Sequence, residues 1–340
     1  MKGSKVQMKE GVEVYHCIIN PDAGRGTGRK WSQSIETFMR GQGKEIIINE
    51  PNSAQEASQW VYDVCLSGSD GIIGVGGDGT IQAIVTGMLN NTQECQIPLG
   101  IIPCGSGNDL ARSFAKISKT DKLDNSTNIE TFSNFAHFEN ITSFMTQPDF
   151  LSLSLKRILQ GEQYAVDAIR VNDKACLNVA NIGLDARIVR NAKRFKRILG
   201  EKAYFASAFI SIAQHENLGL HIRIQDSEKE YEIDGRYTLI AVCNGQYYGG
   251  GMRIAPSARI DDGYITLCLI SELSRIRTFG LFPTVLSERH IYLKEVQYIE
   301  CKRCIITPTD TSTTLCMDGN LSEHSGSLEF EILPNAIRII

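Results

Sequence analysis

The five residues Gly76-Gly77-Asp78-Gly79-Thr80 separate an apolar strand from an apolar helix. Glycines let the backbone approach another group closely, and successive N–H groups at a helix start make an anion site. Asp78 would repel a phosphate unless a metal ion lay between them, and Mg²⁺ prefers one or two carboxylates with phosphate oxygens. A tight turn capped by Asp78 is the alternative. The stretch therefore indicates either a phosphate site or a strand-to-helix turn.

Two neighbouring segments repeat this design. PCGSGNDLAR (103–112) has Gly105, Ser106 and Gly107 between a strand and a helix that begins with Asn108 and Asp109. NPDAGRGTGRK (20–30) follows the first strand and reads as a third glycine-rich loop. The spacing is neither that of a Walker loop nor that of a dinucleotide fingerprint. Because ligands bind at the carboxyl ends of the strands in open α/β sheets, three such loops indicate a shared phosphate site.

The elements before these loops alternate regularly. We expect strands at 12–20, 44–50, 70–76 and 97–103, and helices at 31–39, 54–66, 81–89 and from 108. Asn52 and Ser53 are candidate caps for the second helix. Short apolar strands that alternate with helices predict a parallel sheet with helices on both faces. The first part of the chain is therefore predicted to be an α/β domain.

The chain changes character after residue 116. Residues 116–149 are polar and predict a loop or a small helical insertion. From about 164 the sequence is β-rich, with turn signals such as DGR and DDG, and predicts a mostly antiparallel second domain. Expected strands are 163–172, 174–183, 218–226, 229–245, 263–271, 296–308 and 313–320, and expected helices are 184–199, 202–214 and about 274–287.

Composition excludes several classes of protein. The 340 residues suit two domains, and the net charge of −4 does not favour nucleic acid as a partner. No apolar run is long enough to span a membrane, and the polar residues 1–10 are no signal peptide. Ten cysteines are scattered along the chain, which favours a reducing cytoplasm. Cys301 and Cys304 lack the second pair that a structural zinc site of this kind needs.

Motifs along the chain occur in the order of one enzyme family. They are Asn20-Pro21 with Gly24, GGDGT at 76–80, PLGIIPCGSGNDLAR at 98–112, LNVANIGLDA at 177–186, NGQYYGGGMRIAPSARIDDGYITL at 244–267, MDGN at 317–320 and LPNAIRII at 333–340. In these motifs the chain resembles the diacylglycerol kinase catalytic family, which includes bacterial soluble lipid kinases and the sphingosine kinases. The resemblance implies an ATP-binding domain at 11–163 with 322–340, and a lipid-substrate β-sandwich domain at 164–321.

The resemblance also implies roles for single residues. Asp318 matches the aspartate proposed as general base, which takes the proton from the lipid hydroxyl. Asp262 matches a ligand of bound Mg²⁺, and the carbonyls of Arg259 and Tyr264 would complete that site. The positions that match ATP-binding residues are Asn20, Gly76, Gly77, Asp78, Gly79, Thr80, Gly105, Ser106, Asn108 and Asp109. Among these, Asp78 and Asp109 match acidic positions of the metal network. From the residues alone, DDG and MDGN also read as plain hairpin turns.

The implied activity is ATP-dependent phosphorylation of a lipid hydroxyl, with diacylglycerol as the leading acceptor and phosphatidic acid as product. Sphingoid bases and other long-chain alcohols stay open. Gln82-Ala83 replaces the Asn-Glu of the family, and Asn320 replaces a glutamate. These neutral residues also fit a nucleotide- or lipid-binding protein with weakened or lost catalysis. NAD kinase shares the GGDGT loop, but the motif at 244–267 favours a lipid kinase.

Residues 184–199 predict a basic amphipathic helix that could lie on anionic lipid. Its apolar residues are Leu184, Ile188, Phe195, Ile198 and Leu199, and its basic ones are Arg187, Arg190, Lys193, Arg194, Lys196 and Arg197. The alternative is a solvated helix that covers the core of the second domain. We expect a lipid substrate at the membrane surface, peripheral membrane contact and no nucleic acid. A homodimer stays an open alternative.

Overall fold

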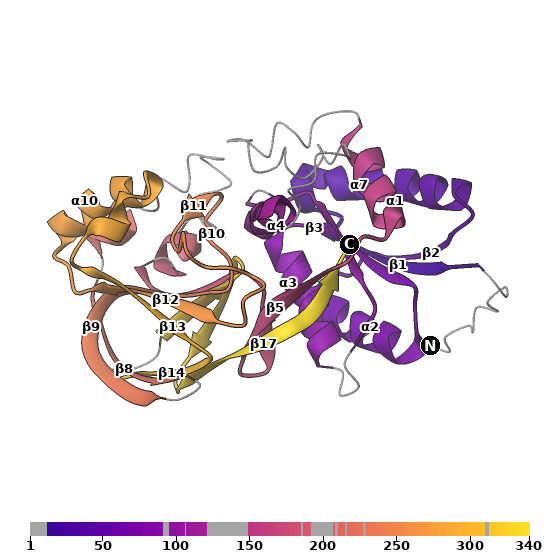
Figure 1. Ribbon diagram of the computed structural model, residues 1–340. Helices are drawn as coiled ribbons and strands as arrows, with labels where there is room; N and C mark the ends of the chain where they lie inside the picture. Colours follow the sequence, from indigo (N-terminus) through magenta and orange to yellow (C-terminus); the bar gives the residue numbers. More distant parts are fainter. Residues whose placement is uncertain are drawn as a thin grey trace. The chain divides into compact units, whose positions relative to one another are not determined.

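The computed structural model describes residues 12–90, 95–105, 107–120, 149–184, 186–191, 207, 210–214, 216–226, 229–309 and 313–340 (Figure 1). The chain divides into two compact units. Unit 1 comprises Met1–Ser106, Asn140–Tyr164 and Ile337–Ile340, and unit 2 comprises Gly107–Glu139 and Ala165–Ala336. The domain boundaries expected from the sequence stay a prediction.

Unit 1 contains a parallel sheet in the order β4-β3-β1-β2. The strands are β1 (Val14–Ile19), β2 (Glu45–Asn49), β3 (Gly71–Gly76) and β4 (Leu99–Pro103). All residues of β1, β3 and β4 are buried, as expected for strands covered on both faces. The end of β17 (Leu328–Ile339) lies parallel to β4, where Ile339 pairs with Leu99.

Helices cover both faces of this sheet (Figure 1). α1 (Ala23–Gly41) and α7 (Phe150–Gln160) lie on one face, and α2 (Ala54–Ser67) and α3 (Asp78–Leu89) lie on the other. Ser53 caps α2, since its hydroxyl accepts a hydrogen bond from the Glu56 N–H at 3.1 Å. The predicted α/β domain is confirmed.

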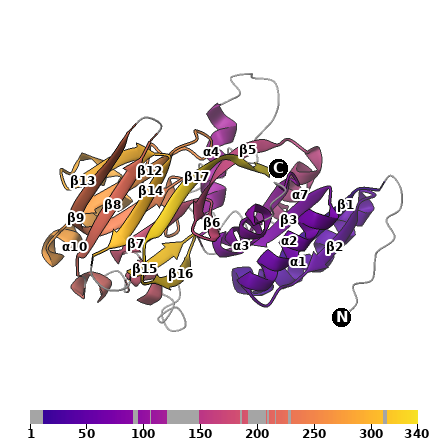
Figure 2. The same ribbon diagram turned by 90° about the horizontal axis from the view of Figure 1, so that it is seen from below.

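Unit 2 is mostly antiparallel, and its strands are seen face-on in Figure 2. β9 (Glu230–Cys243) is the longest of them and pairs with β8 (Leu218–Gln225), β7 (Val179–Gly183) and β12 (Ile265–Ser271). The other strands are β5 (Tyr164–Val171), β6 (Lys174–Cys176), β10 (Tyr247–Tyr248), β11 (Met252–Arg253), β13 (Val296–Cys301), β14 (Arg303–Pro308), β15 (Thr313–Met317) and β16 (Asn320–His324). This is the predicted β-sandwich.

Alternation along β9 shows why the two faces of this strand belong to different hydrophobic clusters. Ile240 and Val242 point into the sandwich core, while Leu239, Ala241 and Cys243 point to the other face. α10 (Arg275–Leu286) covers that second face with Leu281 and Val285. The 3₁₀ helix η2 (Arg289–Tyr292) follows it, and α4 (Asp109–Thr120) also belongs largely to this unit.

Three expectations were wrong in detail. The segment 20–30 is not a loop, because α1 already begins at Ala23 and includes Gly24, Gly26 and Gly28. The expected strand 174–183 breaks at 177–178 into β6 and β7, and the expected strand 296–308 turns at Lys302 into β13 and β14. α7 was not expected, and 121–148, the bulk of the predicted insertion, lies outside the described residues.

The cysteines are not all free thiols. Cys65 on α2 and Cys95 form a disulfide that closes a loop with a sequence separation of 30. The other eight cysteines are free and buried, including Cys301 and Cys304. The scattered spacing of the cysteines gave no sign of this pair. No helix among the described residues is long and apolar enough to cross a membrane.

Candidate active site

The loops at the carboxyl edge of the unit 1 sheet meet at the end of β3. The carbonyl of Val75 accepts a hydrogen bond from the Asn20 N–H at 2.9 Å, and the carbonyl of Gly76 accepts one from the Cys104 N–H at 2.9 Å. The Asn20 side-chain amide also donates to the Thr80 hydroxyl at 3.2 Å. The structure therefore brings the segments after β1, β3 and β4 together, as their sequences predict.

Glycine is required where these segments touch. A Cβ on Gly76 would lie 2.5 Å from Cβ of Thr80, and one on Gly77 would lie 3.0 Å from Cα of Gly105. Gly24 has φ of +60°, and a Cβ there would lie 2.8 Å from the carbonyl oxygen of Cys104. Side chains at these positions would push the segments apart, so the glycines serve close backbone approach as well as turning.

The GGDGT residues form the start of a helix. Gly77 is the N-cap of α3, and its carbonyl accepts hydrogen bonds from the Thr80 and Ile81 N–H groups at 2.9 and 3.2 Å. Asp78 and Gly79 lie in the first turn and are partly exposed. A helix N-terminus reached by solvent suits an anionic group. Ser106 lies outside the described residues, and Gln82 and Ala83 are buried in α3.

Asp318 is held by the backbone between β6 and β7. Its carboxylate accepts hydrogen bonds from the N–H groups of Leu177 (2.9 Å), Asn178 (3.1 Å) and Val179 (3.1 Å), and from the Cys176 thiol at 3.5 Å. The side chain is 8% exposed. Burial, and next the charge of Asp318, raise the pKa of the Cys176 thiol well above its usual value. Three amide donors stabilise a carboxylate in its ionised form, which a proton acceptor needs.

Asp109 is connected to this group through α4. The Ser113 hydroxyl donates to the side-chain oxygen of Asn178 at 2.9 Å, and Ser113 also contacts the Asp109 carbonyl at 3.3 Å. The Asp109 carboxylate accepts a hydrogen bond from the Gly250 N–H at 2.8 Å and lies 3.8 Å from Nε of Arg112. Two aspartates that were predicted from separate motifs are thus connected within unit 2, through the Asp318 carboxylate and the backbone carbonyl of Asp109.

Asn108 precedes Asp109 and has a left-handed backbone with φ of +53°, which asparagine tolerates better than most residues. It is also buried. The contact of Asn108 with ATP stays a prediction.

Asp262 lies in a separate acidic group of unit 2. Its carboxylate accepts a hydrogen bond from the Tyr264 N–H at 3.0 Å. Partial burial, and then the charges of Asp167, Asp261 and Glu300, raise the pKa of Asp262. Carboxylates that repel one another gain most from a cation, and one carboxylate with carbonyls and water fits Mg²⁺. The Arg259 side chain bonds Asp261 at 3.0 Å, so only its backbone carbonyl would serve such an ion.

No described group of three or more histidine, cysteine, aspartate or glutamate side chains could hold a metal ion. A magnesium site at Asp262 would therefore depend on the carbonyls of Arg259 and Tyr264 and on water. The acidic residue next to this site that the sequence analysis missed is Asp167. It is buried, and it accepts hydrogen bonds from the Gly263 and Asn335 N–H groups, both at 2.7 Å.

Asn178 and Asn244 were quoted only as parts of motifs, yet they shape the Asp318 site. The carbonyl of Asn178 accepts hydrogen bonds from the N–H groups of Asn244 and Gly245, both at 2.9 Å. The Asn244 side chain donates to the carbonyls of Leu177 at 2.8 Å and Asp167 at 3.0 Å. Asparagines in an apolar context, as in LNVAN and VCNG, were the signal that could have indicated this role.

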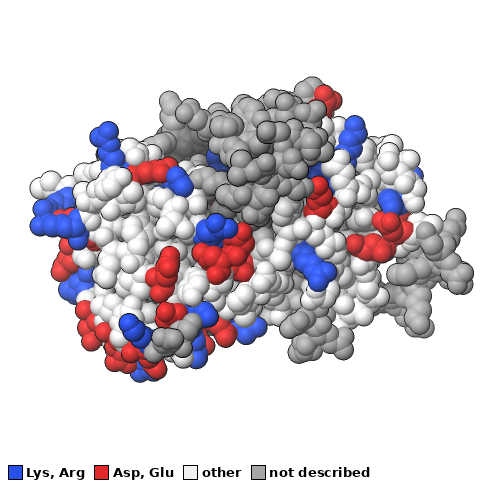
Figure 3. Space-filling view, viewed as in Figure 1, with Lys and Arg blue, Asp and Glu red and all other residues white. Residues whose placement is uncertain are grey.

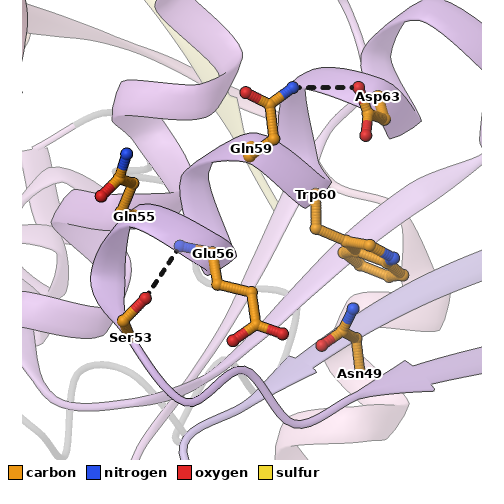
Figure 4. A pocket seen from close by; sticks show the side chains of 7 residues that line it. All are labelled: Asn49, Ser53, Gln55, Glu56, Gln59, Trp60 and Asp63. Carbon is orange, nitrogen blue, oxygen red and sulfur yellow. Dashed lines mark hydrogen bonds between the residues drawn. The ribbon is translucent and has the colours of Figure 1, made fainter.

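A surface pocket of about 440 Å³ lies beside α2, away from all of these residues (Figure 4). It is lined by Asn49, Ser53, Gln55, Glu56, Gln59, Trp60 and Asp63. Its two carboxylates already accept hydrogen bonds, Glu56 from the Asn52 N–H at 2.8 Å and Asp63 from Gln59 at 3.1 Å. None of the predicted site residues lines it, and we assign it no ligand.

The described part of the predicted membrane helix packs inward. Leu184 and Ile188 are buried in a cluster with Ile212, against which Phe279 and Phe282 pack. Arg190 forms an ion pair with Glu323, and Arg187 bonds the carbonyl of Gln214. Residues 192–199, with most of the predicted basic charge, lie outside the described residues. Membrane contact by 184–199 stays a prediction.

Comparisons with known proteins identify the family of this chain. Residues 15–135 match the model of the diacylglycerol kinase catalytic domain, and residues 178–340 match the YegS C-terminal NAD kinase beta sandwich-like domain. A diacylglycerol kinase of Mycobacterium tuberculosis is 24% identical over 291 residues, which cover 84% of this chain and 82% of that protein. An Enterobacter protein named "Probable lipid kinase YegS-like" is 26% identical over 264 residues, with 77% and 75% covered.

Solved structures show the same fold. Two solved structures from Bacillus anthracis titled "putative diacylglycerol kinase" superpose with a TM-score of 0.71 at 21% and 19% identity. A third from the same organism, titled as a diacylglycerol kinase, superposes with a TM-score of 0.68 at 21% identity, and each of the three covers 98% of both chains. The two family models span both the GGDGT segment and the Asp318 segment. From the motifs, the fold and these matches, the chain belongs to the diacylglycerol kinase-like family of lipid kinases.

Proposed function

We propose that this chain transfers the γ-phosphate of ATP to the hydroxyl of a lipid, with diacylglycerol as acceptor and phosphatidic acid as product. The observation that carries the proposal is the junction at the end of β3. There Gly76 leaves room for the Thr80 side chain and Gly77 for the Gly105 backbone, and the partly exposed start of α3 follows. Backbone N–H groups at such a helix start bind phosphate.

In this proposal Asp318 takes the proton from the acceptor hydroxyl. The hydroxyl oxygen then forms a bond to the γ-phosphorus, and the bond from that phosphorus to the bridging oxygen of ADP breaks. Phosphoryl transfer depends mainly on positioning and charge neutralisation, and three backbone amides hold the Asp318 carboxylate in a fixed orientation within unit 2. Asn20, Gly76, Gly77, Gly79, Thr80, Gly105, Ser106 and Asn108 are the proposed ATP contacts.

Mg²⁺, when bound, would neutralise charge on the phosphates. Asp78 and Asp109 are the proposed carboxylates of that network. Asp262, with the carbonyls of Arg259 and Tyr264, is the proposed second place for Mg²⁺, and the raised pKa of Asp262 is what such an ion would reverse.

An apolar cavity in unit 2 supports a lipid acceptor. It lies under α10 and is lined mostly by apolar side chains, among them Leu184, Ile188, Leu281, Phe282 and Val285. Its volume is about 30 Å³, which holds roughly one water-sized group. An acyl chain would therefore enter only as side chains such as Phe282 move. The side chains that line the cavity do not distinguish diacylglycerol from a sphingoid base or another long-chain alcohol.

A second candidate is a nucleotide- or lipid-binding protein with little catalysis. The observation that favours it is the pair of neutral residues Ala83 and Asn320, where the resemblance led us to expect carboxylates. Ala83 is buried in α3, and Asn320 begins β16 two residues after Asp318. Asp78, Asp109, Asp262 and Asp318 are all present, which argues for the kinase.

Transfer of radiolabel from ATP with Mg²⁺ to lipids in mixed micelles tests the proposal, with diacylglycerol, a sphingoid base and a long-chain alcohol as acceptors. We expect labelled phosphatidic acid from the native chain and none from Asp318→Ala. The control is Leu315→Ala, which removes a buried side chain from the adjacent strand β15 without touching the carboxylate. ATP binding without transfer to any acceptor would favour the second candidate.

We place this reaction at the cytoplasmic face of a membrane, as a step of phospholipid biosynthesis. ATP and a membrane lipid meet there, and the net charge of −4 gives no reason to expect nucleic acid as a partner. A count of free thiols in protein from cytoplasmic extracts tests the compartment, because the Cys65–Cys95 disulfide would favour an oxidising environment.

A further inference from the structure

The solvent side of α10 is apolar. Ile276 is 85% exposed and Leu286 is 51% exposed, and Gly280 and Pro283 on the same side are exposed as well. Between Arg277 and Leu286 the sequence has no charged residue. A surface helix normally places charged side chains toward water, so an exposed apolar side marks an interaction surface.

The opposite side of the same helix is fixed in the fold. Thr278, Leu281 and Val285 are buried, and Leu281 and Val285 belong to the cluster on the outer face of β9 and β12. Ser274 caps the helix, since its hydroxyl accepts from the Arg277 N–H at 3.5 Å. The exposed residues are therefore presented by a helix that is packed in place.

Basic residues surround this apolar side. Arg275 and Arg277 lie in the first turn, and exposed Arg289 and Lys294 follow the helix. Arg277 forms an ion pair with Glu295 at 2.8 Å, so it is not counted in this surface. Glu288, the one acidic residue between Arg275 and Lys294, is paired with Arg253 at 2.8 Å. In Figure 3, blue side chains flank an uncharged surface in the region of α10 at the left.

An exposed aromatic ring extends the surface. Tyr292, in η2, is 83% exposed, and η2 contacts α10. Aromatic residues with a polar tip are favoured at the boundary between lipid and water. We call Ile276, Pro283, Leu286 and Tyr292, with Arg275, Arg289 and Lys294, the α10 surface.

We propose that the α10 surface docks on a membrane that contains anionic lipids, so that the helix above the apolar cavity lies in the headgroup layer. The apolar side chains would enter the acyl boundary, and the basic ones would lie against lipid phosphates. Leu281 and Val285 line the apolar cavity from the other side of the same helix. This inference rests on the proposed lipid kinase activity for its purpose, not for its geometry.

Sedimentation with vesicles of phosphatidylcholine, with or without phosphatidylglycerol, tests the docking without ATP or substrate. The native chain should bind the anionic vesicles. Ile276→Asp with Leu286→Asp should weaken that binding by on the order of tenfold or more, and Arg289→Glu with Lys294→Glu by about as much. The matched control is Leu66→Asp, a 55% exposed leucine on α2 in unit 1, which should bind like the native chain.

Tyr292→Trp gives a second readout, since its fluorescence should shift to the blue on anionic vesicles. Native-like binding by the charge and apolar variants would overturn the proposal, and so would a native chain that does not bind these vesicles. A dimer that Ile276→Asp converts to a monomer would also overturn it, because a second copy would then cover the surface.

Activity separates this inference from the proposed function. The variants should phosphorylate a short-chain diacylglycerol dissolved as monomers at the native rate, and should lose rate only on diacylglycerol in anionic vesicles. A native chain that binds anionic vesicles but phosphorylates neither substrate would refute the kinase and leave the docking in place. Equal loss of rate on both substrates would refute the docking as the cause.

Discussion

Replacing Asp318 by asparagine separates its two proposed functions, as an anchor for the backbone and as a general base. The carboxylate oxygens accept hydrogen bonds from three backbone N–H groups at 2.9 to 3.1 Å. Asparagine has nearly the same shape but only one acceptor oxygen. Its NH₂ group must therefore face at least one of these N–H donors.

The structure gives the size of the loss. If the amide oxygen keeps the bonds to Asn178 and Val179, the NH₂ group faces the Leu177 N–H and that bond is lost. A bond to a charged acceptor contributes about 1.5–3 kcal/mol, and a buried N–H without a partner costs about 1–3 kcal/mol. We therefore expect the free energy of unfolding to fall by roughly 3–5 kcal/mol. This is a large part of the stability of an ordinary domain, about 5–15 kcal/mol.

Urea denaturation, monitored by circular dichroism, measures this fall in stability. Initial rates measured without urea at low temperature report catalysis by the folded molecules. Loss of a general base should reduce the rate per folded molecule by about 10²- to 10⁴-fold. Leu315→Ala, a cavity variant that loses about 2–5 kcal/mol, should keep the native rate per folded molecule. A stability change below about 1 kcal/mol would refute the anchor. A folded Asp318→Asn enzyme within a few-fold of the native rate would refute the base.

Three other changes test other parts of the chain. Gly76→Ala would place a Cβ 2.5 Å from Cβ of Thr80, so it should lower stability by about 1–3 kcal/mol. We expect ATP to raise the melting temperature of the native chain in a thermal shift assay, and the variant should lose that rise. Burial lowers the pKa of His16, so near pH 6.5 the unfolded chain binds a proton that the folded chain does not. The free energy of unfolding should therefore fall as the pH drops through 6.5, the ordinary pKa of histidine. His16→Gln should flatten this pH dependence in urea titrations at pH 5 to 8. A thiol titration of the denatured protein should find eight free thiols before reduction and ten after it. Reducing the Cys65–Cys95 disulfide should lower the free energy of unfolding by about 3–4 kcal/mol. Ten free thiols before reduction would contradict the disulfide.

Periodicity and glycine spacing were enough to predict the α/β part of the fold. Apolar runs that end in glycines located β1, β3 and β4, and parallel pairing then required their following segments to meet at one edge. The start of α1 was missed because Gly24, Gly26 and Gly28 read as a loop. In the structure they lie in the first turns of the helix, where Gly24 contacts the segment after β4.

The surroundings of Asp318 could not be read from the sequence. The family motif located the carboxylate, but its amide donors lie about 140 positions earlier, in a stretch that looked like one continuous strand. The break between β6 and β7 that frees those N–H groups depends on Asn178 and Asn244, whose contacts are all long-range. Long-range hydrogen bonds leave no periodic pattern, so neither this break nor the role of Asp167 was predicted.

The C-terminal end of β17 has a consequence for synthesis. The N–H of Ile340 donates to the carbonyl of Leu99 at 3.1 Å, and Ile337–Ile340 belong to unit 1, whose other described residues all precede Ala165. Unit 1 therefore cannot complete its fold until residues 337–340 leave the ribosome, after nearly all of unit 2. We expect unit 1 of the nascent chain to stay protease-sensitive until residues 337–340 have emerged, and deletion of 337–340 should leave it so. Protection of ribosome-bound chains that end before β17 would contradict this order.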